Sequence, residues 1–304
     1  MKALLICPAE RSAVSTLGQR RPLAALPFLG LDLVEYWLQH LALRGAKQVI
    51  VLVADRPDEV AALVGDGARW GLALNVIPTA RELTPEEARA RYRDGDDDAW
   101  LAAPDDIVLV DHLPNAPRLR PLQSYADWFA AARDWIPHAL TPDRVGLREI
   151  RPGVWLGFHA HVAPTARLIA PCWIGDDAYV GPGAVVGPNV ILENRVIVEG
   201  GAHIFDSVIG PDTFVGGITE VAHSLAWGDL LINWLSGSIL RVTEEYLLCS
   251  VERSRTVISP TRWVRSKTGT LTRALAAPVH AFWRRAGAWR APAPTPEARP
   301  LGSR

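Results

Sequence analysis

The sequence predicts an α/β fold in which a parallel, doubly wound sheet is followed by a parallel β-helix. In the first part of the chain, short apolar runs alternate with amphipathic segments of helical length. This is the pattern of strand–helix–strand units around a parallel sheet. In the second part, an aliphatic residue recurs at every sixth position. That period fits neither a helix nor an ordinary strand, but it fits the flat faces of a β-helix.

Residues 1–145 are expected to form the α/β domain. Strands are expected at Ala3–Cys7, Gln48–Ala54, Ala73–Pro78 and Asp106–Asp111. Helices are expected at Leu31–Leu43, Arg56–Val64 and Ser124–Trp135, with Ser124 as an N-cap. We expect the polar stretch Arg81–Pro104 to be a solvated loop, although its acidic run Asp94–Asp98 would also attract a divalent cation. Pro137–Pro152 is expected to be a linker.

The six-residue ladder defines a β-helix over residues 146–226. Its aliphatic positions are Val162, Leu168, Ile174, Val180, Val186, Leu192, Val198 and Ile204. Small or β-branched residues follow four places later, at Ala166, Cys172, Ala178, Ala184, Val190, Val196, Ala202 and Val208. After Ile204 one residue is dropped, and the phase resumes at Ile209. Residues 227–252 lose the phase and are expected to cap the open end of the solenoid.

Composition bounds the class of protein and its compartment. Cys7, Cys172 and Cys249 are widely spaced, which favours a reducing, cytoplasmic setting over a disulfide or zinc framework. Residues 253–304 hold 11 Lys and Arg against one acidic residue, although the whole chain has a net charge of −1. This tail is expected to be disordered in part, and Leu271–Trp289 would suit an anionic membrane surface as a basic amphipathic helix. No specific nucleic-acid partner is expected.

Three segments resemble the sugar-1-phosphate nucleotidyltransferases, such as the mannose-1-phosphate guanylyltransferases. Leu26–Glu35 looks like the family phrase L-P-V-x-G-K-P-L-I-E, and Arg44–Val51 is similar to A-G-x-x-E-I-I-V. Asp106–Asp111 is similar to the family strand that ends in a metal-binding aspartate. The resemblance implies a left-handed β-helix. It also implies a nucleoside triphosphate and a sugar 1-phosphate as substrates, with Mg²⁺ held by Asp111.

The first loop departs from the family pattern at the positions that would bind phosphate. Ligands of such sheets bind beyond the carboxyl ends of the strands, and here Pro8, Ala9, Glu10 and Ser12 would form that nucleotide-binding rim. The family loop is A-G-G-x-G-T-R, whereas residues 7–13 are CPAERSA. The glycines are missing, Pro8 lacks an N–H group, and Glu10 repels phosphate.

Two cationic positions of the family are also lost. Ala13 stands in place of an arginine and Leu23 in place of a lysine. Arg11, Arg20 and Arg21 are the nearby cations that would compensate. No catalytic residue is therefore assigned at this rim.

Three functions remain open. The favoured one is a nucleotidyltransferase-like protein of nucleotide-sugar or cell-envelope polysaccharide metabolism whose catalytic site is degenerate. The second is acyl transfer on the coil, with His203 as general base and His159, His161 and His223 as weaker alternatives. The third is a non-catalytic assembly module, since we expect the β-helix to form homo-oligomers.

Overall fold

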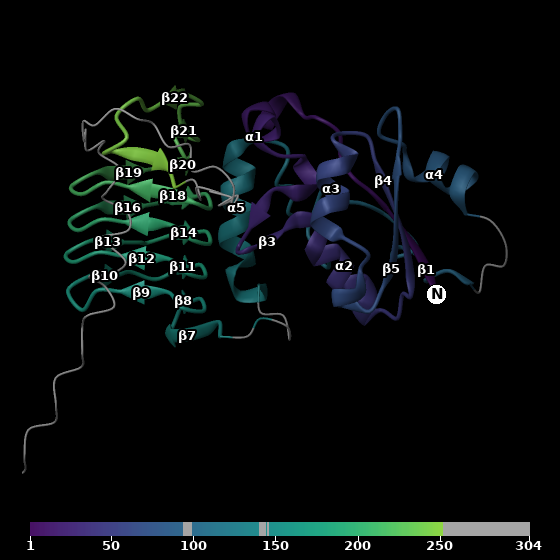
Figure 1. Ribbon diagram of the computed structural model, residues 1–304, viewed down its shortest axis with the longest axis horizontal. Coiled ribbons are helices and arrows are strands. Elements are labelled where there is room, and N and C mark those ends of the chain that lie inside the picture. Colours follow the sequence, from purple (N-terminus) through teal and green to yellow (C-terminus); the bar gives the residue numbers. More distant parts are fainter. Residues whose placement is uncertain (94–98, 140–143, 145, 252–304) are drawn as a thin grey trace, which may run out of the picture. The chain divides into compact units, whose positions relative to one another are not determined.

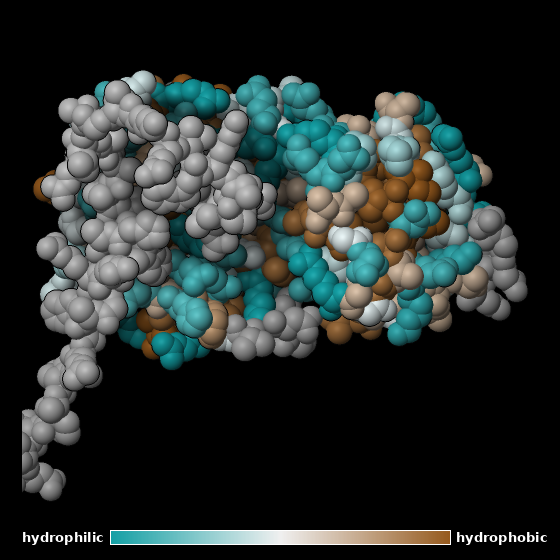
Figure 2. Space-filling model, viewed as in Figure 1, coloured by the Kyte–Doolittle hydropathy of each residue, from teal (hydrophilic) through white to brown (hydrophobic). Residues whose placement is uncertain are grey.

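The first part of the chain forms a four-stranded parallel sheet with the strand order β5–β4–β1–β6 (Figure 1). The structure is a computed structural model that describes residues 1–93, 99–139, 144 and 146–251. The strands are β1 (Lys2–Ile6), β4 (Gln48–Val53), β5 (Ala73–Pro78) and β6 (Ile107–Leu109). All four lie within a residue or two of their predicted positions. Apolar surface gathers over the α/β part of the molecule in Figure 2.

Helices cover both faces of this sheet, as the doubly wound prediction requires. The α-helices are α1 (Ser15–Arg20), α2 (Leu33–Leu43), α3 (Pro57–Val64), α4 (Pro85–Tyr92) and α5 (Tyr125–Trp135). The 3₁₀ helices are η1 (Ser12–Val14), η2 (Leu23–Ala25), η3 (Ala68–Trp70) and η5 (Ile136–His138). Leu5 and Val51 pack on the side of α2 and α3, whereas Leu4 and Ile6 pack on the side of α4. Alternate residues of one strand therefore bury opposite faces.

Helix α4 lies inside the stretch that we expected to be a loop, and this part of the prediction is wrong. Thr84 accepts a hydrogen bond from the Glu87 N–H and forms a capping box with it, and Pro85 occupies the first helical turn. Both are helix-start signals. They were obscured because the segment has little apolar periodicity. Residues 94–98 lie outside the described residues, so the acidic run is not tested.

A β-hairpin precedes α2, which begins two residues later than predicted. Its strands are β2 (Pro27–Phe28) and β3 (Leu31–Asp32). Leu29 and Gly30 join them with φ values of 51° and 80°. Two successive left-handed residues are typical of the tight turns that fit the twist of a hairpin. At the other end of the sheet, Ser124 caps α5 as predicted, because its side chain accepts from the Asp127 N–H.

In the second part, the strands of the repeat form three parallel sheets in the strand arrangement of a left-handed β-helix (Figure 1). The first sheet holds β8 (Val154–Leu156), β11 (Cys172–Ile174), β14 (Val190–Leu192), β17 (Ser207–Ile209) and β20 (Ser224–Trp227), and β7 (Arg148–Arg151) pairs antiparallel with β8 at its edge. The second holds β9 (His161–Val162), β12 (Tyr179–Val180), β15 (Ile197–Val198) and β18 (Thr213–Val215). The third holds β10 (Arg167–Leu168), β13 (Val185–Val186), β16 (His203–Phe205) and β19 (Glu220–Ala222).

The aliphatic ladder lines the interior of this coil. From Leu168 to Ile204 every ladder residue is buried, and Val162 is partly buried. Cys172 is fully buried among them, as expected for a packing residue. The dropped residue changes one assignment, because Ser207 pairs with Val190 and takes the inward place. Val208, the last residue of the small-residue series, instead packs outward in the cluster that holds the α/β core.

Antiparallel strands follow the repeat. β21 (Leu230–Asn233) pairs with β20, β22 (Ile239–Arg241) pairs with β21, and β23 (Leu248–Ser250) pairs with β18. The tail and its predicted basic helix lie outside the described residues. None of the helices in the described part of the chain has the length and apolar character needed to cross a lipid bilayer.

One outer face of the coil packs against the α/β part. Trp173, Ile191 and Val208 share a buried cluster with Trp128 and Phe129 of α5.

The β2–β3 hairpin is bound at the same junction by Glu193, which follows β14. The Glu193 carboxylate accepts from the N–H groups of Leu29 and Gly30, each at 2.6 Å. Arg144 donates to the Leu29 carbonyl. Glu193 interrupts a column of glycines in the coil, since the equivalent residues in neighbouring turns are Gly157, Gly175 and Gly210.

Candidate functional site

A cavity of about 490 Å³ opens at the carboxyl ends of β1 and β6. It is lined by Arg11, Ser12, Ala13, Asp111, Arg120, Leu122 and Gln123. The first loop and the segment after β6 therefore meet where ligands of parallel sheets bind. Of the predicted rim residues, Ser12 lines the cavity directly, and Glu10 is exposed on the same loop, whereas Pro8 is buried.

Asp111 is bound by protein cations in this cavity. The Arg120 guanidinium donates to both of its carboxylate oxygens, at 2.7 and 2.8 Å. The Nδ1 atom of His112 lies 2.7 Å from the same carboxylate. Partial burial raises the pKa of Asp111, but the His112 hydrogen bond and the Arg120 charge outweigh it and leave that pKa below its ordinary value.

This environment does not fit the predicted metal-binding role of Asp111. A Mg²⁺ ion would have to compete with the Arg120 Nη1 group, which donates to both carboxylate oxygens. Over the described ranges of the chain, no three His, Cys, Asp or Glu side chains are grouped so that they would hold a metal ion. We therefore derive no step through Mg²⁺ at this position.

The first loop is occupied by a second carboxylate, that of Glu82. Its Oε2 accepts from the Ala9 N–H at 2.7 Å, and its Oε1 accepts from the Arg11 guanidinium at 2.6 Å. The side chains of Glu82 and Arg11 are 20% and 33% exposed, so solvent screens this pair only in part. The loop N–H group and the nearest cation, which would meet a phosphate, are thus already bound.

Arg20 and Arg21 do not compensate for the missing phosphate ligands, because both side chains turn toward the end of the coil. Arg20 forms an ion pair with Asp229 at 2.5 Å. Both guanidinium groups lie over the Trp227 ring, at 5.7 and 5.9 Å from its centroid. This cation–π packing makes them part of the junction rather than of the rim.

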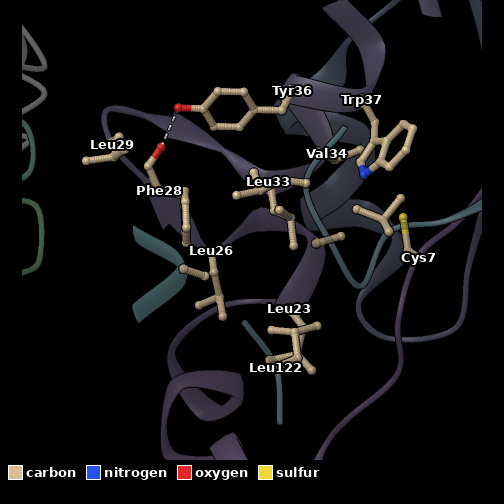
Figure 3. Packing of buried hydrophobic residues seen from close by; sticks show 14 of the residues in the cluster. Cys7, Leu23, Leu26, Phe28, Leu29, Leu33, Val34, Tyr36, Trp37 and Leu122 are labelled. Atoms are coloured by element: carbon tan, nitrogen blue, oxygen red, sulfur yellow. Dashed lines mark hydrogen bonds between the residues drawn. The ribbon is translucent and has the colours of Figure 1, made fainter. Parts of the chain in front are cut away.

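Leu23, at the position of the family lysine, has no access to the rim. Its side chain is fully buried and lies beside Leu122 in the core shown in Figure 3. The same view shows the hydrogen bond from the Tyr36 hydroxyl to the Phe28 carbonyl, which measures 2.9 Å. Leu23 therefore belongs to the core packing of the α/β part and not to the rim.

The histidines of the coil have different partners. His203 is exposed on β16, where it pairs in register with Val185 and Glu220. His161 stacks on Tyr179 with 5.5 Å between ring centroids. His223 lies edge-on to Trp234, and His159 lies 3.6 Å from Asp177.

Sequence reasoning missed three residues of the rim and junction. Glu82 and Arg120 carry no signal in the sequence, because each reaches its partner from an irregular segment. Glu193 did carry one. In the neighbouring turn of the coil the equivalent residue is Gly175, where an added Cβ would lie 2.7 Å from backbone atoms of the next turn. A glutamate at such a crowded position indicates a special contact.

Comparison with known proteins matches separate parts of the chain. Residues 171–205 match the family model described as "Bacterial transferase hexapeptide (six repeats)". A glucose-1-phosphate thymidylyltransferase of Streptomyces griseus is 28% identical over 111 residues. That match covers 36% of this chain and 31% of the relative. The chain thus spans about a third of the curated relative that it matches.

Solved structures of acetyltransferases are similar to this chain only at low TM-scores. A perosamine N-acetyltransferase mutant from Caulobacter crescentus has a TM-score of 0.19 and 17% identity, covering 64% of this chain and 97% of that one. The acetyltransferase domain of PglB from Neisseria gonorrhoeae has a TM-score of 0.16 and 14% identity, covering 62% and 98%. No statement about activity follows from likenesses this weak.

Proposed function

We propose that this chain is a non-catalytic nucleotidyltransferase-like protein that serves as a regulator or scaffold in nucleotide-sugar metabolism. The observation that carries this proposal is the pairing of both rim cations with protein carboxylates. Arg120 binds Asp111, and Arg11 binds Glu82. Glu10 adds a further negative charge on the first loop.

Nucleotidyl transfer depends on the neutralisation of phosphate charge and on the positioning of the reacting groups. A rim whose cations are already paired with protein carboxylates contributes little to the neutralisation of phosphate charge or to the positioning of the reacting groups. The partial match to a thymidylyltransferase and the sequence phrases around the β2–β3 hairpin support descent from such an enzyme. In this proposal the rim retains a sugar phosphate or nucleotide as a ligand, and the coil acts as the surface for assembly into a homo-oligomer.

The proposal is tested by measuring the release of pyrophosphate. The full chain is incubated with each nucleoside triphosphate, a panel of sugar 1-phosphates and Mg²⁺. We expect the rate to equal that of the Asp111→Ala variant and of the background without protein. Robust turnover that is lost in Asp111→Ala would show that the site is catalytic.

Acyl transfer is the second candidate, supported by the exposed imidazole of His203 on the outer face of the coil. A general base requires a hydrogen bond that orients it. In the described part of the chain no hydrogen bond orients the His203 imidazole. Calorimetry with acetyl-coenzyme A distinguishes the candidates. Binding together with an activity that is lost in His203→Ala would favour acyl transfer, and the absence of binding at millimolar ligand would remove it.

A further inference from the structure

The contact of Glu82 with the first loop has the chemistry of a bound phosphate. A phosphate oxygen in such a loop accepts hydrogen bonds from backbone N–H groups and from a guanidinium. The Glu82 carboxylate accepts one bond of each kind, from Ala9 at 2.7 Å and from Arg11 at 2.6 Å. An internal anion therefore satisfies the donors that an external anion would use.

The space for an external anion lies next to this contact. Arg11 lines the cavity of about 490 Å³ and also binds Glu82, so its guanidinium joins the two. Arg11 further donates to the Ala9 carbonyl at 3.1 Å, which holds the loop in its present form. If Glu82 were displaced, the Ala9 N–H and the Arg11 guanidinium would be free to bind a ligand in the cavity.

We propose that Glu82 is an internal gate on an anion site in the first loop, and that a phosphate group enters by displacing its carboxylate from Ala9 and Arg11. The inference rests on the proposed function, since it concerns the same rim and adds its regulation. The ligand class is a phosphate-bearing compound, whether nucleotide, sugar phosphate or free pyrophosphate. Affinity in the wild-type chain is low because the ligand must first break the Glu82 contacts.

The test is calorimetry of the full chain with three probes: inorganic pyrophosphate, a nucleoside triphosphate and a sugar 1-phosphate. In Glu82→Gln the side chain keeps its shape and loses its charge, so the competition for Arg11 weakens. We expect at least one probe to bind roughly tenfold more tightly than to the wild type. The probe with the largest gain identifies the source of the phosphate.

Glu87→Gln is the matched control. Glu87 lies five residues further on and pairs with Arg81 at 2.5 Å, so the change removes the same charge without touching the first loop. We expect its affinities to equal those of the wild type. The gain in Glu82→Gln should disappear when Arg11→Ala is added, because the released cation is then absent.

Unchanged affinity of folded Glu82→Gln for all three probes would overturn the gate. If that variant does not fold, Glu82→Asp decides the question, since the shorter side chain cannot reach Ala9 and Arg11 together and should give a smaller gain. These outcomes do not test the proposed function. The proposed function is contradicted by pyrophosphate release in the wild-type chain, whatever the affinity of the Glu82 variants for the three probes.

Discussion

Glu193 should make the stability of the chain depend on pH in a predictable direction. Burial raises the pKa of Glu193 to about 7 from an ordinary value of 4.5, and the N–H groups of Gly30 and Leu29 oppose this only in part. Because one pH unit of pKa is worth about 1.4 kcal/mol, ionisation of the folded protein costs about 3 kcal/mol. Stability from this group is complete below pH 4.5 and is lost as the pH rises through 7.

Replacement of Glu193 by Gln removes this titration. The free energy of unfolding, measured by urea denaturation, should therefore rise in the variant relative to the wild type by about 3 kcal/mol between pH 4.5 and pH 8. The amide also loses one N–H partner at the hairpin, but that offset does not depend on pH. Parallel curves for the two proteins would refute the reasoning.

Asp32 is the control for this experiment, since burial followed by repulsion from Glu35 also raises its pKa to about 7. The Glu193-dependent difference should persist in an Asp32→Asn background. Its disappearance there would assign the pH dependence to Asp32 instead.

Three further changes test the fold. Ile218 is 90% exposed with a φ of 62°, a conformation that is costly for a β-branched residue. Ile218→Gly should therefore raise the free energy of unfolding by roughly 0.5–1 kcal/mol, and destabilisation would contradict this. Leu23→Lys restores the family residue at a buried site, so it should cost roughly 3 kcal/mol or more rather than create pyrophosphate affinity. A stable Leu23→Lys variant that binds pyrophosphate would show that position 23 belongs to the rim. Ser124→Ala removes the cap of α5 and should lower the thermal midpoint through a loss of about 1 kcal/mol, and an unchanged midpoint would mean that the cap is not formed.

The fold was predictable where the sequence is periodic. The ladder from Leu168 to Ile204 is buried as predicted because each residue must face the narrow interior of the coil. Strands β1, β4 and β6 were predictable because most of their residues are buried, which requires continuous apolar runs. Helix α4 was missed because its position is set by a capping box and by few apolar contacts.

The site was predictable only in its location. The missing glycines and the leucine at position 23 predict a rim unlike that of the enzymes it resembles, and the structure places Leu23 in the core. The partners that replace phosphate and metal were not predictable. Glu82 and Arg120 reach Arg11 and Asp111 across 71 and 9 residues of chain, and such pairings depend on the tertiary fold rather than on any local pattern.

The central claim is that protein groups, and not a metal ion or phosphate, neutralise the charges of the rim. Mn²⁺ prefers the same oxygen ligands as Mg²⁺, and its unbound fraction is measured by electron paramagnetic resonance in the presence of a nucleoside triphosphate. The account predicts equal Mn²⁺ binding by the wild-type chain and by Asp111→Asn, because Arg120 holds the Asp111 carboxylate. Tighter Mn²⁺ binding by the wild type that is lost in Asp111→Asn would contradict it.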